Sequence, residues 1–154
     1  MTETVETRLL AMGVTLPPAA APAANYVPYC LSGKLLFTAG QLPLENGKLA
    51  ATGLLGRDLH TASGKAAARL CAINVLAQAK AATGDLETVA KLVKITVFVA
   101  STPEFTEQHL VANGASDLLA EALGEKGRHA RSAVGVASLP LDAPVEVEAV
   151  FEIA

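Results

Sequence analysis

Hydrophobic and polar residues alternate along the chain with two different periods, which predict where strands and helices lie. The strongest strand pattern covers residues 92–99, where β-branched residues recur at every second position. We expect four of these side chains to share one face: Val93, Ile95, Val97 and Val99. Residues 144–153 alternate in the same way, with acidic residues on the second face. Shorter strands are predicted at 27–31, 35–40 and 132–138, with a weaker strand or loop at 49–55.

A long apolar segment, residues 61–82, predicts a helix with Thr61 as its cap and Gly84 as its end. Because this helix is apolar around most of its circumference, it must be covered on more than one side. A second helix is expected to begin at Thr102 and Pro103 and to run to Gly124, with a possible break near Asn113 and Gly114.

The first 24 residues have a different composition from the rest of the chain. A short amphipathic helix is predicted up to a glycine stop at Gly13. The three prolines between residues 16 and 24 remove backbone donors, so this stretch is expected to be extended. We therefore predict one domain, 1–154, in which residues 1–24 form an N-terminal helix and an Ala/Pro-rich lead-in.

The order of the predicted elements indicates an α+β fold: two or three strands, a helix, a strand, a helix and two strands. Such an order favours a mixed sheet with two long helices packed on one face. Hydrophobic residues make up 51% of the 154 residues, with a mean hydropathy of +0.39, so exposed apolar surface should be covered by oligomerisation.

Charge and composition argue against several classes of partner. The net charge is −3, no dense basic run occurs and aromatic residues are only 4%, so no nucleic-acid binding is expected. No apolar run reaches the length of a membrane span, and the N-terminus lacks the pattern of a secretory signal. We expect a cytoplasmic protein without a membrane partner, in which Cys30 and Cys71 are reduced.

Known catalytic and cofactor motifs are absent from the sequence. No glycine-rich phosphate loop, HExxH, CxxC or GxSxG occurs, so neither a cofactor nor a metal is expected. Arg131, at the start of a strand, and Glu146, on the strand expected to pair with it, remain as candidates. An arginine fork can hold a carboxylate through two hydrogen bonds, but composition alone favours an ordinary, partly exposed ion pair between these two residues.

Several segments in order resemble the YjgF/RidA reactive-intermediate deaminases, also called the L-PSP endoribonuclease family. The resemblance runs from about Pro22 to Ile153 and is carried by these segments: Pro28-Tyr29, Gly40-Gln41-Leu42-Pro43, Asn74-Val75, 93–99, Ala130-Arg131-Ser132, Leu139-Pro140 and 145–149. It implies a chorismate-mutase-like subunit that forms a homotrimer with a pocket wherever two subunits meet.

The resemblance also implies an activity: hydrolysis of 2-imino and enamine acids to 2-oxo acids and ammonia. Arg131 would hold the substrate carboxylate, Glu146 would position or activate water, and Tyr29 would contact the ligand. The implied substrate-binding residues are Tyr29, Ala39, Gly40, Asn113, Arg131 and Ala133. From the residues alone, Tyr29 could equally be a strand aromatic that packs beside Pro28.

The sequence departs from the family pattern at the predicted pocket. Ala39 stands where the family commonly has serine, Ala133 stands where a cysteine is often found, and the segment before Arg131 is about five residues longer. These changes indicate a divergent subgroup. Two further functions therefore stay open: a non-catalytic protein that binds a small carboxylate, and an endoribonuclease, which the low basic charge disfavours.

Overall fold

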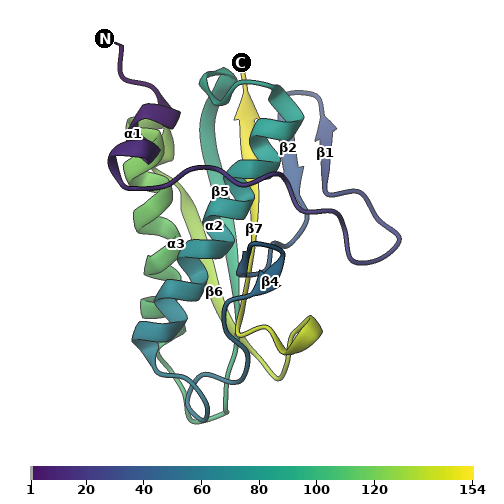
Figure 1. The fold of residues 1–154 in the computed structure, drawn as a ribbon, viewed down its shortest axis with the longest axis vertical. Coiled ribbons are helices and arrows are strands. Elements are labelled where there is room, and N and C mark those ends of the chain that lie inside the picture. The colour runs from purple at the N-terminus through teal and green to yellow at the C-terminus, as the bar shows by residue number, and fades with distance from the viewer. Residues whose placement is uncertain (1) are drawn as a thin grey trace.

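A five-stranded mixed sheet with its helices on one side organises the computed structural model, which describes residues 2–154 (Figure 1). The helices are α1 (Val5–Ala11), α2 (Thr61–Thr83) and α3 (Gln108–Leu123). The sheet strands are β1 (Tyr29–Ser32), β2 (Leu35–Thr38), β5 (Val89–Ala100), β6 (Ala130–Val136) and β7 (Val145–Ile153). A small hairpin of β3 (Leu44–Glu45) and β4 (Lys48–Leu49) and three 3-10 turns, Leu86–Thr88, Gly124–Gly127 and Pro140–Asp142, complete the chain.

The order of the strands corrects one expectation about the site. The sheet runs β1-β2-β7-β5-β6, with β5 parallel to β6 and antiparallel to β7. The strands that carry Arg131 and Glu146 are therefore separated by β5, although the sequence interpretation paired them through a short turn. The predicted pairing was wrong because β5, the longest strand, lies between β6 and β7 and pairs with both.

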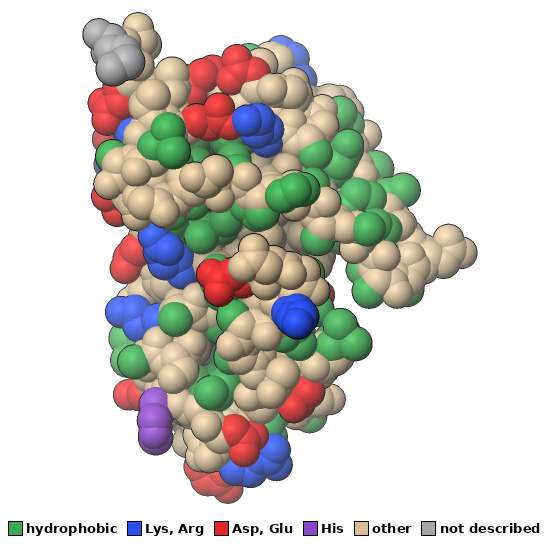
Figure 2. Space-filling model, viewed as in Figure 1, with side chains coloured by type: hydrophobic (Ala, Val, Ile, Leu, Met, Phe, Trp, Pro, Cys, Tyr) green, Lys and Arg blue, Asp and Glu red, His purple; other side chains and the backbone are tan. Residues whose placement is uncertain are grey.

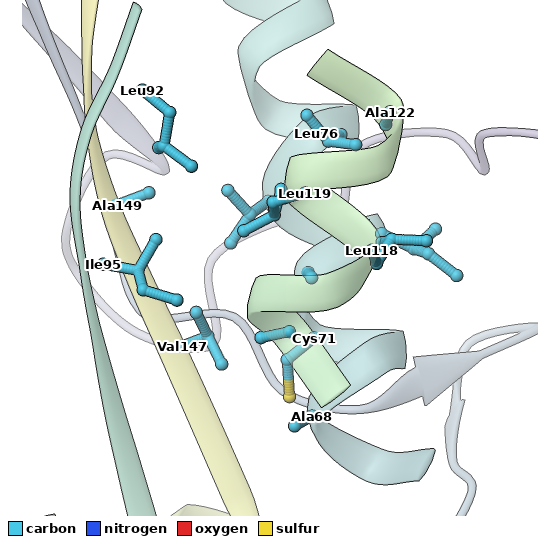
Figure 3. Close-up of a cluster of buried hydrophobic side chains, with 14 of the residues drawn as sticks. Ala68, Cys71, Leu76, Leu92, Ile95, Leu118, Leu119, Ala122, Val147 and Ala149 are labelled. Carbon is cyan, nitrogen blue, oxygen red and sulfur yellow. The ribbon is translucent and has the colours of Figure 1, made fainter. Parts of the chain in front are cut away.

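The core lies between the sheet and the two long helices. Ile95 of β5 and Val147 of β7 point toward Leu119 of α3, and all three side chains are fully buried (Figure 3). The predicted α+β class, with a mixed sheet and two long helices on one face, is therefore observed. α1 is a third helix, which the sequence predicted as an extra N-terminal element. Residue 1, the first of the predicted 1–24 segment, lies outside the described residues.

Strand β5 does not keep the simple alternation that the sequence indicated. A β-bulge between Leu92 and Lys94 shifts the register, so Leu92 is buried while Val93 is 37% exposed. Beyond the bulge, the alternation is as expected, with Ile95 and Val97 in the core. The predicted face of Val93 was wrong because the bulge reverses the side-chain order at that point.

Helix boundaries follow the predicted stop signals better than the predicted starts. α2 ends as expected at Gly84, whose φ of 79° is the left-handed conformation of a glycine cap. Its start is capped by His60 without a side-chain hydrogen bond, so Thr61 is not the cap; its hydroxyl donates to Glu107 instead. α3 begins at Gln108, six residues after the predicted cap at Thr102, because residues 102–105 form a separate turn.

The expected break in α3 does not occur. The helix continues through Gly114, which packs directly against the backbone of Lys65 in α2, where a side chain would not fit. The glycine thus marks a close helix–helix approach rather than a helix end.

The second face of the sheet is not covered by a helix among the described residues. Outward-facing side chains on this face include Phe37 and Val134, each 42% exposed, and Leu35, 38% exposed. On the side seen in Figure 2, hydrophobic side chains also gather over the β1–β2 edge and the neighbouring lead-in, where Tyr26 and Leu31 are exposed. Among residues 2–154, no helix is long and apolar enough to cross a membrane.

Candidate functional site

Arg131, at the start of edge strand β6, is anchored by neutral groups of α3. Its Nη1 donates to Oδ1 of Asn113 at 2.9 Å and to Oγ of Ser116 at 3.1 Å, and its Nη2 donates to the carbonyl of His109 at 3.0 Å. No carboxylate pairs with Arg131 among the described residues. The positive charge of the guanidinium is therefore not compensated by a neighbouring carboxylate of these residues, while α3 fixes its orientation.

Three of the five N–H groups of Arg131 are used in this way. Within residues 2–154, the Nε–H and one Nη2–H have no acceptor. Unpaired N–H groups of an arginine can bind a carboxylate through charge-assisted hydrogen bonds. Arg131 thus has both a fixed position and two donors available to a ligand.

An open hollow of about 510 Å³ leads to this guanidinium. Its lining comes from α3, from the turn at Gly124–Gly127 and from the start of β6: Ser116, Asp117, Ala120, Gly127, Arg128, His129 and Arg131. Two arginines and a histidine against one aspartate make the hollow suited to a small anion.

Ser116 and His129 link Arg131 to the loop that precedes it. Oγ of Ser116 lies 2.9 Å from Nε2 of His129, and Nδ1 of His129 lies 2.6 Å from the carbonyl oxygen of Gly127. Sequence reasoning did not assign either residue to the site. Asn113 and Ser116 are three residues apart on a helix, so they share one face; that spacing was the available signal.

Glu146 lies elsewhere, on β7 beside Gly40. Gln41 forms a β-bridge with Val147, which places Gly40 against the side chain of Glu146. A Cβ at position 40 would lie 2.7 Å from Cδ of Glu146, so the carboxyl group occupies the space that this glycine leaves open. Gly40 and Glu146, both predicted site residues, are thus brought together, with Ala39 next to Gly40 in the chain.

Burial raises the pKa of Glu146, and the nearby carboxylate of Glu148 raises this pKa further. The side chain is about half buried and has no hydrogen-bond partner among the described residues. A carboxyl group in this state is easier to protonate than an exposed one, which suits a group that exchanges a proton with water.

Glu146→Gln is expected to stabilise the protein at pH 7. The folded-state pKa of Glu146 lies above its unfolded value, so its favourable contribution is complete below the unfolded pKa of about 4.3 and is lost as pH rises through the folded pKa. Glutamine does not ionise, so the variant should unfold at higher urea concentration than wild type at pH 7 and at nearly the same concentration at pH 4. Equal midpoints at pH 7 would contradict this expectation; Glu152→Gln, exposed on the same strand, is the control.

Apart from Tyr29, the predicted site residues form two separate groups within one chain. Arg131 is the cross-strand partner of Ile95 and lies with it on the face that the helices cover. Glu146 is the cross-strand partner of Phe98 and lies on the uncovered face of the sheet. Tyr29, half-buried on β1, lies at the opposite edge from Arg131. Four strand spacings separate those edges, a distance of about 19 Å.

The first group consists of Arg131 and Asn113, with Ala133 two residues along β6 on the helix-facing side of the sheet. The second consists of Ala39, Gly40 and Glu146. Among residues 2–154, no three His, Cys, Asp or Glu side chains gather closely enough to hold a metal ion.

Comparison with known proteins finds a matching family and a similar protein, each over nearly the whole chain. Residues 6–153 match the family described as "YjgF/chorismate_mutase-like, putative endoribonuclease". Protein TCP17 from Trypanosoma cruzi is 53% identical over 150 residues, which are 97% of this chain and 94% of that protein.

Two solved structures resemble the fold closely. Protein Atu1372 from Agrobacterium tumefaciens, of unknown function, is 58% identical with a TM-score of 0.92, covering 97% of this chain and 92% of the other. A protein from Shewanella oneidensis described as a "putative endoribonuclease" is 38% identical with a TM-score of 0.96, covering 98% and 100% of the two chains.

Proposed function

The chain belongs to the YjgF/chorismate-mutase-like family, and we propose that it hydrolyses 2-imino and enamine acids to 2-oxo acids and ammonia. The observation that carries this proposal is how Arg131 is held and what its guanidinium leaves open to a ligand. Its guanidinium is held by three neutral acceptors, lines an open hollow and keeps two N–H donors for a ligand carboxylate.

The reaction requires little beyond the orientation of substrate and water and the transfer of protons between them. With the carboxylate on Arg131, water adds to the carbon of the C=N bond and gives a carbinolamine, which loses ammonia to leave the 2-oxo acid. Glu146 accepts a proton from the attacking water and returns one to the departing nitrogen, a role for which its raised pKa is suited. Holding both reactants in place supplies much of the remaining acceleration.

One chain cannot bring Arg131 and Glu146 to the same ligand, because the two residues face opposite sides of the sheet. The proposed site therefore takes Arg131 from one subunit and Glu146 from a neighbour. The uncovered sheet face around Glu146 exposes Phe37 and Val134, which supports burial against another copy. We propose a homotrimer, as the family resemblance implies, in which each junction forms one site.

Mixing two inactive variants tests this arrangement. Arg131→Ala and Glu146→Gln chains are unfolded separately, combined in equal amounts and refolded together. A site that takes Arg131 from one subunit and Glu146 from the next is intact in about one quarter of random junctions, so the mixture should recover about a quarter of wild-type activity. The assay generates 2-iminobutanoate enzymatically and follows its conversion to 2-oxobutanoate in competition with a trapping amine.

The controls are each variant refolded alone, which should stay inactive. If the mixture also stays inactive although it forms oligomers, the two residues do not meet across subunits. If wild type has no effect on several different imines, the proposed activity itself is excluded.

A non-catalytic carboxylate-binding protein is the second candidate, and the separation of Arg131 from Glu146 within one chain favours it. This candidate needs Arg131 alone. It predicts that 2-oxobutanoate raises the melting temperature of wild type but not of Arg131→Ala, while no imine is turned over. Ribonuclease activity has less support, because the net charge of −3 offers little attraction for a polyanion.

A further inference from the structure

A continuous chain of hydrogen bonds runs from Arg131 to the loop before β6. Arg131 Nη1 lies 3.1 Å from Oγ of Ser116, which lies 2.9 Å from Nε2 of His129. On the other side of the ring, Nδ1 lies 2.6 Å from the carbonyl oxygen of Gly127. All four groups line the hollow of about 510 Å³.

The groups at the two ends of this series of hydrogen bonds, the Arg131 guanidinium and the Gly127 carbonyl, determine the direction of every hydrogen bond between them. A guanidinium only donates, so Oγ of Ser116 accepts from Arg131. A carbonyl oxygen only accepts, so Nδ1 of His129 carries the hydrogen that is donated to Gly127. In the neutral ring, Nε2 is then the acceptor, and the hydroxyl hydrogen of Ser116 points at it.

We propose that Ser116 and His129 are positioning residues that make this carboxylate site proton-linked, so that binding of a 2-oxo acid anion is accompanied by proton uptake on His129. When Nε2 gains a proton, it donates to Oγ of Ser116, and the hydroxyl hydrogen must turn away. The site then contains one more positive charge and one free hydroxyl donor beside the guanidinium.

The charges around His129 come from several elements. Arg128 precedes it in the chain and Arg131 follows two residues later, Asp117 of α3 lines the same hollow, and Glu125 and Lys126 lie in the preceding turn. Lys94 of β5 pairs with the neighbouring Ala130. Arg128 lies 3.9 Å from Glu125 in an exposed ion pair, which removes part of its effect.

A bound carboxylate adds a negative charge close to the imidazole, which favours the protonated ring. By linkage, the affinity for the anion then rises as the pH falls. We expect 2-oxobutanoate to bind about three- to tenfold more tightly at pH 6 than at pH 8. This inference rests on the carboxylate site of the proposed function and does not require turnover.

Titration calorimetry of the full chain with 2-oxobutanoate, in two buffers of different ionisation enthalpy, measures proton uptake directly. Wild type should take up a substantial fraction of one proton per site between pH 6.5 and 7.5. His129→Gln keeps hydrogen-bonding groups but cannot gain a proton, so it should bind with the same affinity at both pH values and without uptake. His60→Gln, which changes an exposed histidine at the start of α2, should behave as wild type.

Ser116→Ala distinguishes the positioning of Arg131 from the effect of the charge on His129. It removes one anchor of Arg131, so we expect weaker binding at pH 6 and pH 8 alike, with part of the proton uptake retained through the charge of His129. Melting curves and the oligomeric state of each variant show whether it remains folded.

The outcomes distinguish this inference from the proposal on which it rests. Binding by wild type without proton uptake, or uptake that persists unchanged in His129→Gln, overturns the proton linkage and leaves the carboxylate site in place. If 2-oxobutanoate does not bind wild type at any pH, the carboxylate site and the linkage are both overturned.

Discussion

Arg131→Ala is expected to lower kcat/KM for 2-iminobutanoate by about 10²- to 10⁴-fold, because two charge-assisted hydrogen bonds of about 1.5–3 kcal/mol each are lost from the transition state. Arg131→Lys should keep part of the activity. Its ammonium preserves the charge, but it cannot make two parallel hydrogen bonds to one carboxylate. Competition between the enzyme and a trapping amine measures each variant.

Arg128→Ala provides the matched control for this experiment. Arg128 lines the same hollow, but its side chain is largely exposed and pairs with Glu125. We expect its activity to stay within a few-fold of wild type, since an exposed ion pair contributes little. If Arg131→Ala and Arg128→Ala lose activity equally, general positive charge rather than the anchored fork accounts for binding.

Gly114→Ala is expected to destabilise the protein, although alanine is the better helix former. A Cβ at position 114 would lie 2.8 Å from the carbonyl carbon of Lys65 and 2.9 Å from its Cα, so α2 and α3 would have to separate. Overpacking of this kind costs about 1–3 kcal/mol, which exceeds or offsets the gain of about 1 kcal/mol from helix propensity. A fall in melting temperature of up to about 8 °C should follow.

The same substitution should also weaken carboxylate binding, because Gly114 is next to Asn113, which anchors Arg131. Glu121→Ala, an exposed change on the same helix, is the control and should leave both properties nearly unchanged. A Gly114→Ala protein as stable as wild type would show that the two helices can separate at little cost.

Much of the fold follows from local signals that the sequence carries. The end of α2 at Gly84 and the turn at Asn46 and Gly47 need only residues that adopt positive φ easily. The alternation of β7 needs only the two-residue period of a strand. Each signal acts within a few residues, so it remains visible without knowledge of the neighbouring elements.

The candidate site could be predicted only in part. Arg131, Asn113, Gly40 and Glu146 were named from the residues and the family resemblance, and the structure brings them together in two pairs. The participation of Ser116 was not foreseen, because a serine within a helix is commonly no more than a solvated side chain. Its role depends on the chain returning from α3 to place His129 within hydrogen-bonding distance.

The amino-acid sequence by itself determined which segments form strands and helices, because side-chain periodicity and the backbone preferences of glycine and proline act locally. Only the tertiary structure decided that β5 lies between β6 and β7, that a bulge turns Val93 outward, and that Arg131 and Glu146 face opposite sides of the sheet. Strand pairing depends on competition between segments far apart in the chain, which a local pattern does not encode.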